Sequence, residues 1–166
     1  NHEFLDGKYP YTINPGGPNH EELVSLIGIY EYFINLYNHH FENKNISTLE
    51  KIKKINKLIE IHEENIANPI LNYLNKRKDL NLIGKNKINN KDRAPTMSFY
   101  SKNKSSKEIS NQLLQYKIAT RNDNFYAWRC LKHLGINTED GVVRLSMTHY
   151  NNIEDTENVI YALEKI

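Results

Sequence analysis

A single arginine, Arg144, interrupts an apolar segment over residues 141–148 that has the composition of a β-strand. If side chains alternate along this strand, Arg144 lies on a half-polar face, and the opposite, apolar face is expected to be core. A guanidinium on a rigid strand presents a planar set of N–H donors to a carboxylate or a phosphate. The alternative is a structural ion pair with Asp140 or Glu154, and the residues alone favour neither.

A second candidate is the segment NPGGPN, residues 14–19, which precedes a helix expected to start near His20. Glycine lets a backbone approach a ligand closely, and backbone amides beside a helix N-terminus can hold an anion. A plain turn at the entry of a helix explains the same pattern and is the interpretation that the residues alone favour.

Cysteine and histidine side chains show no spacing typical of a zinc site, so we predict no metal. His39 and His40 are adjacent and therefore point to different sides of a helix. Cys130, the one cysteine, lies in a predicted helix, where burial as a small hydrophobic side chain is favoured over a role as a thiol nucleophile. No catalytic residue is predicted within the chain.

Composition limits the partners of the protein. The formal net charge of +2 is too small to indicate a nucleic-acid surface, and no apolar run approaches the roughly 18 residues of a membrane span. A single cysteine agrees with a reducing compartment, so we expect a cytoplasmic protein. Because the first residue is Asn1 rather than methionine, we expect the chain to be a piece of a longer protein.

The hydrophobic pattern predicts the elements that position these residues, in an α+β fold with a small, mostly antiparallel sheet covered by helices. A long amphipathic helix over about 20–41 comes first, and Pro69 is expected to kink or divide the second helix, which starts after a capping box at Ser47. The remaining helices are predicted over about 68–78, 105–117, 124–135 and 153–165, and the strands over 80–84, 94–100, 118–120 and 141–148.

Three segments in this order resemble the C-terminal part of a class V aminotransferase, among the cysteine desulfurase-like pyridoxal-phosphate enzymes. They are NPGGPNHEEL, RAPTMSFYS and the stretch from IATRNDNFYAWRCLKHLG to GVVRLSMTHYNNIEDTENVIYAL. The resemblance runs from about residue 8 to the end and is strongest over 93–166. It implies a fold-type I homodimer, in which residues 1–40 end the large cofactor domain and residues 41–166 form the small domain.

The resemblance also implies roles for particular residues. Arg144 matches the arginine that pairs with the α-carboxylate of the substrate. Gly16, Gly17 and Asn19 match a loop that reaches the cofactor phosphate of the neighbouring subunit, with Gly17 standing where the family has threonine. Tyr126 occupies the position of the persulfide-forming cysteine, so the chain resembles relatives that lack this thiol.

The resemblance therefore predicts a transferase or lyase that acts on a small amino acid. It places the lysine that binds pyridoxal phosphate in the large domain, outside this chain, so the chain alone is expected to be inactive and to carry no covalently bound cofactor. Partners are expected to be the substrate and a second copy, through homodimerisation or self-association of the apolar stripe on residues 20–41. The alternative is a non-catalytic α+β interaction or regulatory module.

Overall fold

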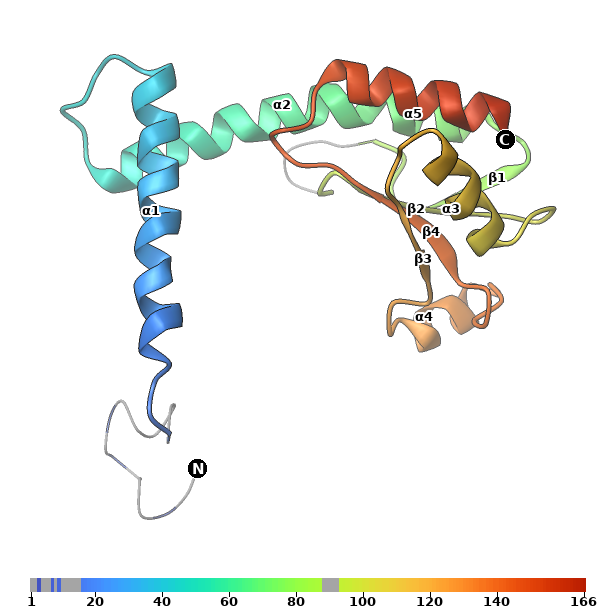
Figure 1. Ribbon diagram of the computed structural model, residues 1–166, viewed down its shortest axis with the longest axis horizontal. Coiled ribbons are helices and arrows are strands. Elements are labelled where there is room, and N and C mark those ends of the chain that lie inside the picture. The colour runs from blue at the N-terminus through green and yellow to red at the C-terminus, as the bar shows by residue number, and fades with distance from the viewer. Residues whose placement is uncertain (1–2, 4–6, 8, 10–15, 88–92) are drawn as a thin grey trace. The chain divides into compact units, whose positions relative to one another are not determined.

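The computed structural model describes residues 3, 7, 9, 16–87 and 93–166. The chain divides into two compact units, residues 1–57 and 58–166. The elements along the chain are α1 (His20–His40), α2 (Thr48–Lys76), β1 (Leu80–Ile83), β2 (Thr96–Ser101), α3 (Ser106–Gln115), β3 (Arg121–Asp123), α4 (Trp128–His133), β4 (Val142–Ser146) and α5 (Ile153–Lys165) (Figure 1).

The first unit contains α1 and the start of α2. The side chain of Asn19 caps α1 by accepting a hydrogen bond from the backbone N–H of Glu22 at 3.1 Å. The predicted capping box of α2 is confirmed, because the Glu50 carboxylate accepts from the backbone N–H of Ser47 and the Ser47 hydroxyl accepts from that of Glu50. Tyr37 is the one residue of α1 that is buried.

The second helix differs from the prediction, since α2 continues through Pro69 without a break. A proline inside a helix removes one hydrogen bond and costs about 3 kcal/mol. The residues that follow, Ile70 and Leu71, are completely buried, and burying each such side chain contributes about 1.5–3 kcal/mol. Packing of this turn in the core therefore outweighs the proline, and the predicted division at Pro69 is wrong.

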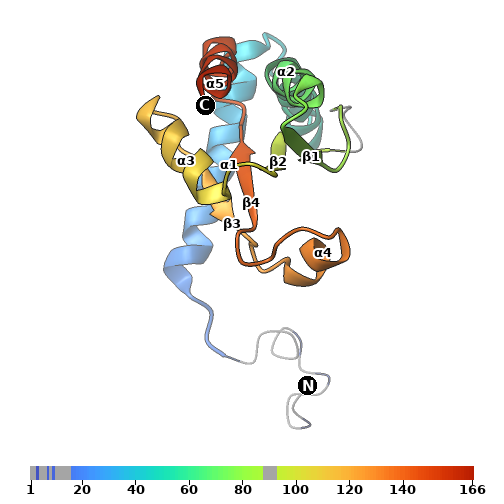
Figure 2. The same ribbon diagram turned by 90° about the vertical axis from the view of Figure 1, so that its right-hand side faces the viewer.

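The second unit is built on a four-stranded antiparallel sheet in the order β1-β2-β4-β3. Figure 2 shows α2 and α5 on one side of this sheet and α4 on the other. The main core lies on the side of α2, α3 and α5, which contribute Ile70, Leu113 and Leu163 against Phe99 of β2 and Val143 of β4. The predicted α+β fold, with a small antiparallel sheet covered by helices, is confirmed.

The segment before α4 is the other place where local structure departs from the prediction. The predicted strand at 118–120 lies at Arg121–Asp123, and the predicted helix over 124–135 is helical only over Trp128–His133. The backbone φ angles of Phe125 and Tyr126 are +52° and +59°, which are incompatible with a right-handed helix. Gly135, which follows the end of α4, has the left-handed conformation typical of a helix C-terminus, with φ +70°.

The last helix, α5, has the predicted bounds because its start is specified locally. Asn152 caps the helix by accepting from the backbone N–H of Asp155, and the Asp155 carboxylate accepts in return from the backbone N–H of Asn152, both at 3.0 Å. The side chain of Asn151 donates a further hydrogen bond to that carboxylate at 3.1 Å. These bonds favour the ionised form and hold the pKa of Asp155 below its usual value.

This capping carboxylate predicts a pH dependence of stability. Because the pKa of Asp155 is lower in the folded than in the unfolded state, its contribution is complete above the unfolded value and is lost as pH falls through the folded value. We expect Asp155→Asn to lower the urea midpoint at neutral pH and to differ progressively less from wild type under acid. Glu154→Gln, in the same turn, is the control, and a difference for Asp155→Asn that stays constant with pH would contradict the assignment.

Candidate functional site

Arg144 lies in the middle of β4, on the face of the sheet that the main core does not cover. The adjacent residues along the strand, Val143 and Leu145, are buried in the main core, as the alternation predicts. In the strand pairing Arg144 lies directly opposite Ser98 of β2 and Arg121 of β3. Residues opposite each other in an antiparallel sheet share a face, so Ser98 and Arg121 flank the half-buried Arg144.

The guanidinium of Arg144 contacts an aromatic ring. Its central carbon, Cζ, lies over the ring of Phe125, 4.3 Å from the ring centroid, which is a cation–π geometry. Across residues 16–87 and 93–166, no carboxylate forms an ion pair with Arg144. Asp140, one of the two acids considered as a structural partner, instead accepts a hydrogen bond through Oδ1 from the backbone N–H of Ser106, at 2.9 Å.

A tight turn brings Phe125 to this position. The side-chain oxygen of Asn124 accepts from the backbone N–H of Tyr126 at 3.0 Å, and its carbonyl accepts from that of Ala127 at 2.8 Å. The chain passes so close to Gly141 that a Cβ atom there would lie 2.2 Å from the carbonyl carbon of Asp123. Glycine at position 141 therefore permits the approach of the segment that carries Phe125.

Phe125 also packs in a small apolar cluster on the same face of the sheet. The buried members are Leu131 of α4, Ile136 and Val142 of β4. This cluster covers one end of the face and leaves Arg144 half-buried beside it. The sequence reasoning missed Phe125, because an aromatic residue inside an expected helix gives no sign of a left-handed backbone or of a contact with a distant strand.

The predicted phosphate loop lies in the first unit. Gly16 and Gly17 are exposed, and a Cβ atom built at either would meet no heavy atom within 4 Å, so their backbone is open to approach. Asn19 uses its side-chain oxygen to cap α1. The first two residues of the motif, 14 and 15, lie outside the described residues.

Cys130 is exposed, so the prediction that it is buried as a small hydrophobic side chain is wrong. The reason is that α4 spans six residues and buries only Leu131 among them. Tyr126, which the resemblance aligns with the persulfide-forming cysteine, has a fully exposed side chain. Within the described part of the chain, no three His, Cys, Asp or Glu side chains come together as a metal site.

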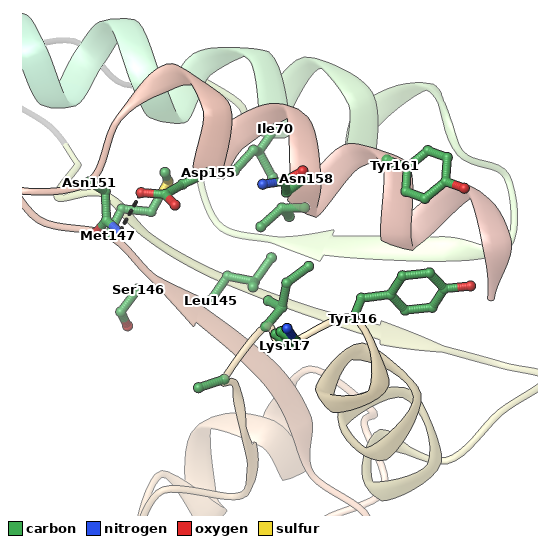
Figure 3. Close-up of a pocket in the computed structure, with 13 residues that line it drawn as sticks. Ile70, Tyr116, Lys117, Leu145, Ser146, Met147, Asn151, Asp155, Asn158 and Tyr161 are labelled. Carbon is green, nitrogen blue, oxygen red and sulfur yellow. Dashed lines mark hydrogen bonds between the residues drawn. The ribbon is translucent and has the colours of Figure 1, made fainter.

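A cavity of about 530 Å³ opens on the other side of β4. Leu145 and Met147, which alternate with Arg144, line this cavity together with Tyr116, Lys117 and Tyr161 (Figure 3). Arg144 is not among the residues that line this cavity.

Comparison with solved structures identifies the fold. The cysteine desulfurase of Thermococcus onnurineus is 24% identical, with a TM-score of 0.57 over 71% of this chain and 29% of that chain. The Escherichia coli cysteine desulfurase CsdA is 21% identical, with a TM-score of 0.54 over 64% of this chain and 24% of that chain. The fold is thus that of a domain of the cysteine desulfurases.

Sequence comparison identifies the family. The model of the family described as aminotransferase class-V matches residues 43–159, and the chain belongs to this family. The aminotransferase-like protein FGM3 of Gibberella zeae is 28% identical over 106 residues, which are 63% of this chain and 26% of that protein. The chain therefore spans about a quarter of the length of this relative. Class V aminotransferases and cysteine desulfurases are pyridoxal-phosphate enzymes.

Among the described residues, no helix is both long enough and apolar enough to cross a membrane.

Proposed function

We propose that this chain is the C-terminal part of a pyridoxal-phosphate enzyme that acts on a small amino acid, and that Arg144 binds the α-carboxylate of that amino acid. The observation that carries the proposal is the guanidinium itself. It is half-buried on a rigid strand, and no described carboxylate neutralises its charge. An arginine in this state is suited to a carboxylate supplied by a ligand, because its N–H donors match both oxygens.

Two parts of this chain fit a phosphorylated cofactor and its substrate. The exposed backbone of Gly16 and Gly17, just before the capped N-terminus of α1, would hold the phosphate of the cofactor in a neighbouring subunit, with Asn19 beside it. When bound, pyridoxal phosphate supplies an electron sink for the amino acid. Arg144 would fix the carboxylate end of the substrate and so orient the bonds at its α-carbon.

The reaction class is a transferase or a lyase. Persulfide chemistry of the desulfurase type is not part of the proposal, because Tyr126 stands at the position that resembles the family's cysteine and a phenol does not replace a thiolate nucleophile. Cys130, although exposed, follows four residues later within α4 and is not assigned this role.

The arrangement within the whole protein is proposed on the same basis. Residues 1–40 end the large domain and residues 41–166 form the small domain of a cytoplasmic homodimer. Five apolar residues of α1 are more than half exposed, namely Leu23, Val24, Leu26, Ile27 and Ile29, and an apolar surface of this kind is typical of an interface. Activity requires a lysine from the large domain, so the 166-residue chain by itself is inactive.

The test uses the whole protein that contains this chain. The purified protein is mixed with pyridoxal phosphate, its visible absorption is recorded, and the sample is reduced with borohydride before peptide mapping. We expect a visible band and a reduced lysine–cofactor adduct outside residues 1–166. Absence of both would contradict the proposal and leave the chain as a non-catalytic module that has kept the fold.

A further inference from the structure

We propose that Phe125 is a positioning residue for Arg144. The face of its ring holds the guanidinium in place and leaves the N–H donors of Arg144 free for an anion. The contact is between Cζ of Arg144 on β4 and the ring of Phe125 in the turn before α4, at 4.3 Å from the centroid, and the two residues are 19 positions apart. The part of this inference that concerns a substrate carboxylate rests on the proposed function, whereas the stacking does not.

The chemistry of the contact explains why a ring suits this position. A carboxylate beside Arg144 would fix the guanidinium, but it would also occupy N–H donors and neutralise the charge. A cation–π contact restrains the cation through its attraction to the ring face and makes no use of hydrogen-bond acceptors. Among the described residues, the guanidinium of Arg144 lies over this ring and forms no ion pair, an arrangement suited to an arginine that binds an anion.

The backbone around Phe125 is held in an unfavourable conformation that serves this contact. Phe125 and Tyr126 have consecutive positive φ angles, although neither is glycine, asparagine or aspartate. Such conformations persist where surrounding structure imposes them, and they are frequent at functional sites. Two residues impose this conformation. The side chain of Asn124 accepts a hydrogen bond from the backbone N–H of Tyr126 and donates one to the carbonyl of Thr138, and Gly141 leaves room for the turn because it has no Cβ atom.

The simpler alternative is that Phe125 only fills the apolar cluster with Leu131, Ile136 and Val142. That role needs an apolar side chain of suitable volume, and leucine or methionine would meet it. Positioning of Arg144 needs the ring face, which tyrosine keeps and leucine lacks. The variants Phe125→Leu and Phe125→Tyr therefore separate the two roles.

The first measurement is the NMR signal of the Arg144 side chain in the whole protein labelled with ¹⁵N and ¹³C in arginine, with Arg144→Lys to assign the signal. We expect the side-chain protons of Arg144 to be shifted upfield by the ring in wild type. The shift should persist in Phe125→Tyr and disappear in Phe125→Leu. An unshifted signal in wild type overturns the inference even if Phe125→Leu fails to fold.

The second measurement is a double-mutant cycle on amino-acid binding to the cofactor-loaded protein, followed by visible absorption. We expect Phe125→Leu to weaken binding about 3- to 10-fold, the size of a partly desolvated cation–π contact, and to have no further effect in an Arg144→Ala background. An equal loss in both backgrounds would overturn positioning through Arg144. If Arg144→Ala leaves binding unchanged while the upfield shift is present, the proposed function fails and the stacking stands.

Discussion

We expect Gly141→Ala, which adds one methyl group, to lower the free energy of unfolding by about 2–5 kcal/mol. This is the largest loss of stability predicted for any single substitution considered in this protein. The Cβ atom of alanine would lie 2.2 Å from the carbonyl carbon and 2.4 Å from the carbonyl oxygen of Asp123, and 2.6 Å from the backbone nitrogen of Asn124. These are backbone atoms, so no flexible side chain can move aside. The φ angle of +70° adds a second cost, because alanine is strained in the left-handed region.

Gly135→Ala is the matched control for this prediction. Gly135 has the same φ of +70°, but a Cβ atom there would meet nothing within 4 Å. Its substitution therefore carries the backbone cost alone, about 1–2 kcal/mol. Urea unfolding of both variants measures the difference, and equal losses would show that the close approach at Gly141 does not limit stability.

The effect of Gly141→Ala should extend to the candidate site. Relief of the clash requires the segment 123–125 to move, and this segment holds Phe125 against Arg144. We therefore expect the variant to weaken the Phe125–Arg144 contact as well as the fold. The upfield NMR shift of the Arg144 side chain measures this, and Gly135→Ala should leave it unchanged.

The parts of the fold that could be predicted are those whose signals are local. The capping box of α5 and its apolar spacing lie within one stretch of chain, and the helix has the predicted bounds, Ile153–Lys165. The four strands and a mostly antiparallel sheet were also predicted from alternation along the chain, although β3 lies three residues later than expected. Local hydrogen bonds and periodicity are sufficient where no distant contact opposes them.

The predictions that were wrong depend on contacts between distant segments. Pro69 does not divide α2, because Ile70 and Leu71 on the following turn are packed in the main core. Cys130 is exposed rather than buried, because α4 is a single short helix that uses Leu131 for packing. Propensity and composition carry no information on these tertiary contacts, and tertiary packing decided both outcomes.

Of the two residues in the candidate site, Arg144 could be predicted from the sequence and Phe125 could not. Alternation along β4 placed Arg144 on the less apolar face, and the structure has it there, half-buried. Its aromatic partner was not predictable, because two consecutive positive φ angles at Phe125 and Tyr126 are contrary to the preference of both side chains. The contact exists through the turn at Asn124 and the space at Gly141, which only the folded chain reveals.

The second large effect is expected on binding. Arg144→Ala in the cofactor-loaded protein should weaken amino-acid binding by about 1.5–3 kcal/mol, the loss of a charged hydrogen-bonded pair. This corresponds to about one to two orders of magnitude in the dissociation constant. Titration followed by visible absorption measures the change. An amine of the same size without a carboxylate should bind equally well to wild type and variant, because it has no group for Arg144 to hold.

Two further variants separate the geometry of Arg144 from its charge. Arg144→Lys keeps the charge and loses the planar fork, so it should recover only part of the affinity. Arg121→Ala removes the same charge from the exposed residue directly opposite in the sheet. Among the described residues, no cation–π contact joins Arg121 to the Phe125 ring. We expect a smaller loss, because an exposed charge is screened by solvent. If Arg121→Ala and Arg144→Ala weakened binding equally, a general positive surface rather than a positioned guanidinium would account for affinity, and the role proposed for Arg144 would have to be abandoned.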